Sequence, residues 1–361
     1  MKVRTLSLIV TVLATLGLLL SACAPAATTA APTTAPTQPP AATSAPTQPP
    51  AAKLNFVLVP KNLGNPYFDT ANKGAQTAAQ ELGVTVTYQG PATADATQQI
   101  TLLNSLIAQK VSGMAISADD ANALVPVGQA AATAGIPVIS FDSAIAKDGR
   151  ILHVNQASTQ GIGDVEVKMA LDETGPSGGE IAILSATSTA PNQNAWIAVM
   201  KADLQQSQYS MLKLDDVVYG NDDDTMSYTQ AQGLLQKYPN LKVIIAPTTV
   251  GIAASARAVS DAKLTGKVFV TGLGTPNQMR DYVKSGVAPE FALWNPGDLG
   301  YLSVYTLFNI ATGKIKGAVG DSFTAGKLGP YTVVNDPDNG PMLLLGQPTI
   351  FDKNNIDNFN F

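Results

Sequence analysis

Residues 55–83 read NFVLVPKNLGNPYFDTANKGAQTAAQELG, and this stretch contains the pattern of a strand, a turn and a helix in immediate succession. Four of its first five residues are apolar, which is typical of a short strand buried on both faces. Asn65 and Pro66 then provide the N-cap and the first-turn proline of a helix. Apolar residues follow at spacings of three and four until Gly83, which closes the helix. The stretch therefore predicts the first half of a βαβ unit.

The same alternation continues in two rounds along the chain. The first round predicts further strands and helices at these positions: strands 84–88, 113–117 and 137–141, with helices near 95–109 and 119–134. The second round predicts another set: strands 180–184, 216–219, 242–246, 268–270 and 291–293, with helices near 193–206, 226–237, 251–263 and 276–285. Strands that recur every 25–30 residues with helices between them indicate parallel sheets.

The expected fold class is α/β, with two doubly wound parallel-sheet lobes and a cleft between them. A helical run at 297–311 and the closing strands are too short for a third domain, so we expect them to return across the cleft as a multi-strand hinge. The expected N-terminal lobe comprises residues 53–155 plus 296–325. The expected C-terminal lobe comprises residues 156–295 plus 326–361.

The N-terminus has the features of an export signal followed by a tether. Lys2 and Arg4 precede an apolar stretch, residues 6–20, that is too short to span a membrane. The stretch ends in Leu-Ser-Ala-Cys at Cys23, which resembles the lipobox of bacterial lipoproteins, where the cysteine thiol carries a diacylglycerol. The alternative is an ordinary secretory cleavage site. Residues 24–52 contain little but Ala, Pro, Thr, Ser and Gln, which predicts an extended spacer.

The composition argues against several classes of protein. The 361 residues carry a net charge of −5 and include one cysteine and one histidine, so a disulfide within a monomer and a cysteine metal site are excluded. Without a basic stripe, a nucleic-acid partner is not expected. His153 lies in an apolar run and is expected to be a strand residue near a lobe edge. The acidic stretches 221–224 and 336–340 are expected to be solvated turns. We expect no catalytic residue, metal or cofactor.

Ligands of open α/β sheets bind beyond the carboxyl ends of the strands, so the residues that follow each predicted strand are the candidate ligand-binding residues. They are Lys61, Asp142, Asn192, Gln193, Asn194, Pro247, Thr248, Thr249 and Trp294, to which we add Asn65, Tyr67 and Phe68 at the start of the first helix. Carboxylates and amides suit a polyhydroxylated ligand. An aromatic face suits the C–H patch of a sugar ring.

These segments resemble those of the type I periplasmic binding proteins, the ribose-binding-like receptors of ABC importers. The resemblance extends from about residue 54 to 360 and rests on five motifs: 60–65, 140–143, 192–196, 246–251 and 291–296. Within that family the chain is most similar to the rhamnose-binding and autoinducer-2-binding branch. This similarity implies that the following residues line the ligand pocket: Lys61, Asp142, Asn192, Gln193, Pro247 and Thr249.

The resemblance implies an extracytoplasmic, lipid-anchored substrate-binding protein that acts as a monomer with an ABC permease. Asn192 and Thr249 favour rhamnose or a related deoxy-sugar, because autoinducer-2 receptors typically have aspartate and alanine at these positions. An autoinducer-2 receptor for uptake or sensing and a pentose or polyol receptor remain alternatives. A glycosidase would need paired carboxylates, and Asp142 is the only acidic residue among the candidates.

Overall fold

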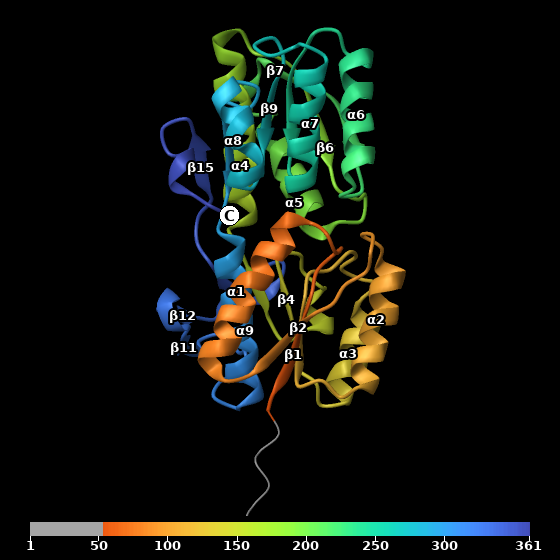
Figure 1. The fold of residues 1–361 in the computed structure, drawn as a ribbon, viewed down its shortest axis with the longest axis vertical. Coiled ribbons are helices and arrows are strands. Elements are labelled where there is room, and N and C mark those ends of the chain that lie inside the picture. Colours follow the sequence, from red (N-terminus) through yellow and green to blue (C-terminus); the bar gives the residue numbers. More distant parts are fainter. Residues whose placement is uncertain (1–52) are drawn as a thin grey trace, which may run out of the picture. The chain divides into compact units, whose positions relative to one another are not determined.

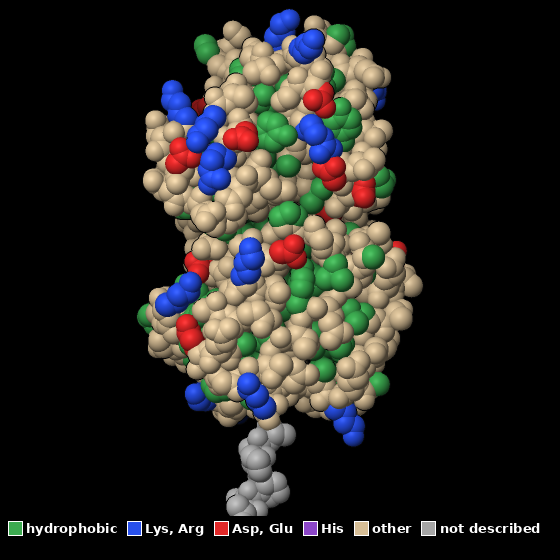
Figure 2. All heavy atoms as spheres, viewed as in Figure 1, with side chains coloured by type: hydrophobic (Ala, Val, Ile, Leu, Met, Phe, Trp, Pro, Cys, Tyr) green, Lys and Arg blue, Asp and Glu red, His purple; other side chains and the backbone are tan. Residues whose placement is uncertain are grey.

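The computed structural model describes residues 53–361, and Cys23 and the expected tether lie outside the described residues. Residues 53–361 contain two α/β lobes, one above the other in Figure 1. In this part of the chain no helix has the length and apolar character needed to cross a bilayer. On the face drawn in Figure 2, acidic and basic side chains are interspersed, and neither sign forms a stripe over the described residues.

The first lobe is built on a seven-stranded sheet with the order β13-β14-β5-β4-β3-β1-β2. Neighbouring strands are parallel except for the antiparallel pair β13 and β14. The strands are β1 (Asn55–Val59), β2 (Thr85–Tyr88), β3 (Gly113–Ile116), β4 (Val138–Phe141), β5 (His153–Asn155), β13 (Val334–Asp336) and β14 (Gly340–Leu344). Its helices are α1 (Pro66–Leu82), α2 (Ala96–Ala108), α3 (Val125–Thr133) and α9 (Pro296–Ala311).

Helices cover both faces of this sheet because each central strand is apolar on both sides. Phe56 and Leu58 of β1 pack in the larger hydrophobic cluster with α1 and α9, whereas Val57 and Val59 pack in the smaller cluster with α2 and α3. The α1 and α9 backbones approach so closely that a Cβ on Gly74 would lie 1.7 Å from a backbone oxygen of α9. Glycine is therefore required at that contact.

The second lobe contains a four-stranded parallel sheet with the order β7-β6-β8-β9. The strands are β6 (Gly179–Ser185), β7 (Leu212–Tyr219), β8 (Leu241–Ala246) and β9 (Phe269–Gly272). A parallel bridge extends the sheet to β10 (Glu290–Leu293), which pairs with β15 (Thr349–Asp352). The helices are α4 (Thr159–Thr174), α5 (Pro191–Asp203), α6 (Asp224–Lys237), α7 (Thr249–Asp261) and α8 (Pro276–Ser285).

The remaining elements are a small hairpin and short 3₁₀ turns. The hairpin pairs β11 (Ser322–Thr324) with β12 (Pro330–Thr332). The 3₁₀ turns are Lys147–Gly149, Gly175–Ser177, Ser207–Tyr209, Gly326–Leu328 and Ile356–Asn358. The chain crosses between the lobes after β5, after β10 and after β14, which gives the hinge more than one strand (Figure 1).

The strand pairing corrects the expected allocation of residues 326–361 to the second lobe. β14 pairs in parallel with β5, so residues 334–344 belong to the sheet of the first lobe, whereas β15 and the residues after it contact the second lobe. β5 consequently lies between β4 and β14, and His153 is inside the sheet rather than near an edge. The lobe boundaries elsewhere stay a prediction.

Two helices also differ from expectation. The helix expected near 119–134 begins only at Val125, because the Asp120 carboxylate accepts hydrogen bonds from the two backbone N–H groups at 122 and 123 and forms a turn there. Helix α4 was not predicted at all. Two glycines in its first turns and the fully buried Glu166 interrupt the apolar pattern that would have revealed it.

Candidate functional site

A cavity of about 30 Å³ lies where the carboxyl ends of the strands of both lobes meet. Such a volume holds about two water molecules. Its lining consists of Lys61, Asn65, Tyr67, Phe68, Asp142, Gln193, Trp196, Asp222, Pro247, Thr248, Thr249, Leu273, Leu293 and Trp294. Ten of the twelve candidate ligand-binding residues are therefore brought together at one place.

Asp142 is the most heavily hydrogen-bonded side chain of the cavity. It follows β4, has a left-handed backbone with φ of 59°, and is 5% exposed. Its Oδ2 accepts from Ser117 Oγ at 2.7 Å, and its Oδ1 accepts from Tyr67 Oη at 3.1 Å and from Asn192 Nδ2 at 3.3 Å. Burial raises the pKa of Asp142, while the charge of Lys61 and the hydrogen bonds oppose the rise.

Lys61 joins the two lobes. The residue lies in the turn after β1, and its Nζ donates to Asn192 Oδ1 at 2.9 Å and to Gln193 Oε1 at 3.0 Å. Both acceptors belong to the first turn of α5 in the second lobe. Ser143 of the first lobe donates to the same Asn192 oxygen at 3.3 Å. Two of the three N–H donors of this buried ammonium therefore have amide acceptors, and no carboxylate among the described residues lies within ion-pair distance of it.

Further contacts between the lobes flank the cavity. Thr249, at the start of α7, donates to Asn65 Oδ1 at 3.4 Å, and that oxygen also accepts from the Tyr67 backbone N–H as the N-cap of α1. Thr189 of the second lobe donates to the Asp119 carbonyl at 3.1 Å. The Asp119 carboxylate is 2% exposed, and burial raises its pKa to about 8. The described structure therefore has its lobes closed on one another.

One wall of the cavity is aromatic. Trp294 Nε1 donates to Tyr67 Oη at 2.8 Å, and the two rings meet edge to face with centroids 6.1 Å apart. Trp196 of α5 lies 6.0 Å from the Trp294 ring, and Phe68 lies 5.1 Å from the Tyr67 ring. Burial, followed by the charge of Asp142, raises the pKa of Tyr67, so its hydroxyl is neutral and can donate. The wall offers apolar ring surface with one polar edge.

Residues 56–315 match the family described as the periplasmic binding protein domain. The chain belongs to this family. Among its relatives are the D-allose-binding periplasmic protein of Escherichia coli, 28% identical over 69% of this chain and 82% of that protein, and the D-ribose/D-allose-binding protein of Pseudomonas aeruginosa, 26% identical over 66% of this chain and 78% of that protein.

Two solved structures resemble the binding protein over nearly their full length. An ABC transporter solute-binding protein from Clostridium phytofermentas with bound L-rhamnose is 40% identical, with a TM-score of 0.83, and the match covers 85% of this chain and 98% of that one. LsrB from Clostridium saccharobutylicum in complex with AI-2 is 27% identical, with a TM-score of 0.80, covering 85% and 100%. The predicted type I fold is thereby confirmed. The chain is a solute receptor of the kind that serves sugar ABC transporters, outside the cytoplasm, rather than an enzyme.

Two of the candidate residues of the binding protein do not line the cavity. Asn194 is not among the lining residues and donates from Nδ2 to the Ser188 carbonyl at 2.8 Å, and its role in ligand binding stays a prediction. Asn192 stays at the site through its contacts with Lys61 and Asp142. The sequence argument missed Asp222, because its acidic stretch was interpreted as a solvated turn. The strand-end rule could have found it, because Asp222 follows β7.

Trp196 and two leucines were missed for a different reason. The position of Trp196 inside a predicted helix favoured a core residue, and the side chain is indeed buried at 3% exposure, yet it also lines the cavity. Leu273 directly follows β9 and Leu293 ends β10, and neither apolar residue was among the candidates, which were chosen for polar and aromatic side chains. Their apolar side chains complete the wall next to Trp294.

Proposed function

We propose that the protein is a lipid-anchored receptor that captures L-rhamnose or a related deoxy-sugar between its lobes and delivers it to the permease of an ABC importer. The observation that supports this best is the convergence of Lys61, Asp142 and Gln193 with the aromatic wall of Tyr67 and Trp294 at one inter-lobe cavity. Charged and amide groups bind the hydroxyls of the ring. The aromatic wall binds its apolar face.

A deoxy-sugar of this kind carries a methyl group, and the methyl group needs an apolar subsite. Phe68 and Leu293 line the cavity on the side of Trp294 and are buried at 2% and 1% exposure. One extra methyl group in such a subsite contributes about 1–3 kcal/mol to discrimination. The same wall would leave the hydroxymethyl group of a hexose without hydrogen-bond partners, which disfavours hexoses.

The mechanism that we propose is hinge closure around the ligand. In the closed lobes Lys61 donates to Asn192 and Gln193, and Asn192 donates to Asp142. A sugar that binds between the lobes has to replace these hydrogen bonds with its own, since buried polar groups left without partners destabilise the complex. Ligand can favour the closed state only through contacts that are better there than in the open state. The permease would recognise the two lobes in their closed arrangement.

Autoinducer-2 is the second candidate ligand. The likeness to LsrB, whose structure contains AI-2, favours it. Two observations favour a deoxy-sugar instead: the higher identity to the L-rhamnose-bound protein, 40% against 27%, and the presence of Asn192 and Thr249 where autoinducer-2 receptors typically have aspartate and alanine.

A titration of the purified protein with several ligands tests the assignment. We expect isothermal titration calorimetry to give the tightest binding for L-rhamnose among L-rhamnose, L-fucose, D-ribose, D-xylose, small polyols and autoinducer-2. A micromolar dissociation constant corresponds to about −8 kcal/mol, which a few charge-assisted hydrogen bonds can supply. Tightest binding of autoinducer-2 or of a pentose would overturn the deoxy-sugar assignment, and no binding at all would overturn the receptor assignment.

Attachment through Cys23 is a separate part of the proposal, supported by the lipobox-like sequence that ends at the only cysteine of the chain. Cells that express the Cys23→Ser variant should lose incorporation of labelled fatty acid and release the protein from the membrane fraction. Unchanged membrane association of this variant would show that the anchor is not at Cys23.

A further inference from the structure

Asp222 is a second carboxylate at the cavity, and it comes from the lobe opposite to Asp142. It lies between β7 and α6, lines the cavity and is 7% exposed. We propose, on the basis of the function proposed above, that the Asp222 carboxylate accepts a hydrogen bond from a ring hydroxyl of the sugar. The ring would then be held between one carboxylate of each lobe.

The backbone at Asp222 has an energetically costly conformation. Asn221 and Asp222 are consecutive left-handed residues, with φ of 55° and 50°. Non-glycine residues adopt this region at a cost and occur there mostly as single residues. Among the described residues the other such positions are Asp142, at this cavity, and Lys110 and Lys263, just after the ends of α2 and α7. Strain of this kind concentrates at functional sites.

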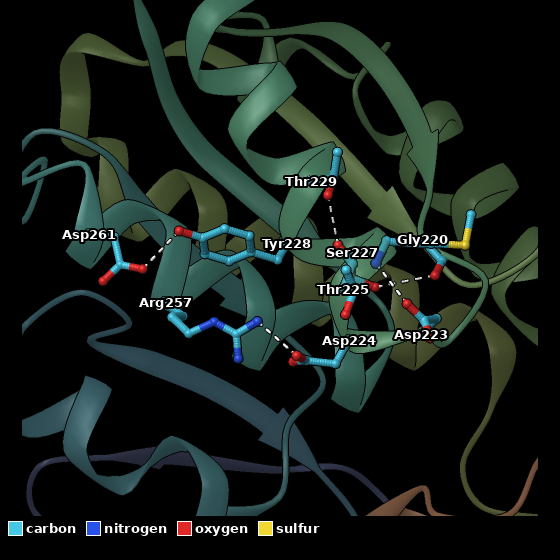
Figure 3. A network of polar contacts seen from close by, with 10 residues as sticks. Gly220, Asp223, Asp224, Thr225, Ser227, Tyr228, Thr229, Arg257 and Asp261 are labelled. Atoms are coloured by element: carbon cyan, nitrogen blue, oxygen red, sulfur yellow. Dashed lines mark hydrogen bonds and ion pairs between the residues drawn. The ribbon is translucent and has the colours of Figure 1, made fainter.

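The three consecutive aspartates at 222–224 have different partners. Asp223 Oδ1 accepts from the Met226 backbone N–H at 2.7 Å and so caps α6. Asp224 Oδ2 lies 2.8 Å from Arg257 Nη2 on the exposed face of α6 and α7. Figure 3 shows both carboxylates engaged in this outer network, which also includes the Tyr228 contact with Asp261. Only Asp222 of the three lines the cavity.

The Asp222 carboxylate retains capacity to accept a further hydrogen bond. Its Oδ1 accepts from the Thr248 hydroxyl, and its backbone carbonyl accepts from Asn62 Nδ2 of the first lobe at 3.5 Å. Within residues 53–361, no hydrogen bond is made to Oδ2. A carboxylate has about four lone-pair sites, so the Asp222 carboxylate, which lines the cavity and has one side-chain donor, can accept a further hydrogen bond from a hydroxyl.

A ligand contact at Asp222 would also favour closure of the lobes. Burial is the main cause of the raised pKa of Asp142, and repulsion by the charge of Asp222 from the other lobe adds to it to a smaller extent. Repulsion of this kind opposes closure without ligand. Sugar hydroxyls that donate to both carboxylates would offset it, and closure would then depend on the ligand.

The alternative is that Asp222 only fixes the Thr248 hydroxyl. The Asp222→Asn variant separates the two roles, because asparagine keeps the size, keeps an acceptor for Thr248 and tolerates the left-handed backbone. We expect calorimetry to show L-rhamnose binding at least about tenfold weaker in this variant, since charge-assisted hydrogen bonds are roughly twice as strong as neutral ones. Binding equal to that of the unsubstituted protein would overturn the inference.

L-rhamnose derivatives that each lack one ring hydroxyl sharpen the test. Removal of the hydroxyl that contacts Asp222 should weaken binding to the unsubstituted protein but change it little in Asp222→Asn, because the two substitutions remove the same interaction. The same penalty for every derivative in both proteins would contradict a direct contact.

Control variants keep the outcome interpretable. Asp224→Asn removes an exposed carboxylate two residues away and should leave the affinity within about twofold, as is usual for surface ion pairs. Asp222→Gly removes the carboxylate without the left-handed cost and should lose at least as much affinity if Asp222→Asn folds poorly. If the unsubstituted protein binds none of the sugars, the proposed function fails. If it binds L-rhamnose and both Asp222 variants bind equally well, only the role of Asp222 fails.

Discussion

The two lobes hold their cavity carboxylates in different ways. Asp142 of the first lobe has two partners from its own lobe, Ser117 and Tyr67, in addition to Asn192 from the other lobe. Asp222 of the second lobe has one side-chain partner, Thr248. In the hinge opening that we propose, the first carboxylate would keep its two hydrogen bonds within the first lobe, so this lobe would present a preorganised site. The second lobe would contribute Asp222, which we expect to gain a hydrogen bond from the sugar only when the lobes close.

Removal of the preorganised carboxylate should have the largest effect. Asp142→Ala takes a charged acceptor from the ligand and leaves Ser117 and Tyr67 without their partner. Since hydrogen bonds to charged groups contribute about 1.5–3 kcal/mol each, we expect affinity for L-rhamnose to fall by about a hundredfold or more. Calorimetry measures this, and circular dichroism of the free protein checks the fold. A smaller loss in Asp142→Ala than in Asp222→Asn would reverse the comparison between the lobes.

The buried ionisable groups provide a second contrast, because His153 of the first lobe and Glu166 of the second should contribute to the pH dependence of stability with opposite sign. In the first lobe, burial, followed by the charge of Arg150, lowers the pKa of His153 to about 3. The unfolded chain binds a proton below about pH 6.5, whereas folded His153 stays neutral. Its contribution to stability is complete above pH 6.5 and falls by about 1.4 kcal/mol per pH unit as pH decreases toward 3.

The measurement is the free energy of unfolding at a series of pH values. We expect the protein to lose stability between pH 6.5 and 4.5 with a steeper slope than the His153→Gln variant. The variant retains a buried polar side chain at this position and cannot take up a proton. Parallel slopes in this window would mean that His153 is charged in the folded protein.

In the second lobe, burial raises the pKa of Glu166 well above its usual value. Neither carboxyl oxygen has a hydrogen-bond partner among the described residues. The folded state therefore retains a proton that the unfolded chain releases above about pH 4.3, and the stability from this group is lost as pH rises toward the folded pKa. Glu166→Gln should raise the melting temperature, with little effect at pH 4.5 and a larger one at pH 8.

Asp172→Asn is the matched control for this prediction. Asp172 lies on the same helix, α4, and its carboxylate forms an exposed pair with Lys168. We expect its substitution to change the melting temperature only slightly at either pH, because exposed i,i+4 pairs contribute about 0.3–0.5 kcal/mol. A gain from Glu166→Gln that is equal at pH 4.5 and 8 would show that titration is not the cause.

The sequence predicted the cavity-lining residues that directly follow the predicted strands. It was less successful for a residue in an acidic turn and for one in the first turn of a helix. Lys61, Asp142 and Thr249 were found because the carboxyl ends of parallel strands meet at one edge. Asp222 was missed because the acidic stretch 221–224 was interpreted as a solvated turn, although this residue also follows the end of a strand. Asn194 does not line the cavity because successive helical residues are 100° apart, so position 194 does not share the helix face of Asn192.

The errors in the fold have similar causes. Strands β13 and β14 are short and only partly buried, and such a pattern does not indicate which of two sheets they join. Helix α4 contains a buried acid, Glu166, whose pKa is raised by burial, and an apolar-periodicity pattern treats this residue as polar. The element order was predictable from apolar periodicity and capping, as the Asn65 N-cap and the Gly83 C-cap confirm.

The smallest predicted effect concerns Thr249, which lies on the second lobe and contacts Asn65 of the first. The hydrogen bond is long, at 3.4 Å, so Thr249→Ala should weaken L-rhamnose binding by only about three- to tenfold, within the 0.5–1.5 kcal/mol of a neutral hydrogen bond. Thr229→Ala is the control, because this exposed hydroxyl of α6 bonds only within its own helix (Figure 3). Calorimetry on both variants with L-rhamnose and autoinducer-2 gives the decisive comparison. Because the alanine resembles the residue of autoinducer-2 receptors, binding of that ligand should not weaken in Thr249→Ala. An unchanged L-rhamnose affinity would show that the contact of Thr249 with the first lobe does not contribute to closure around the sugar.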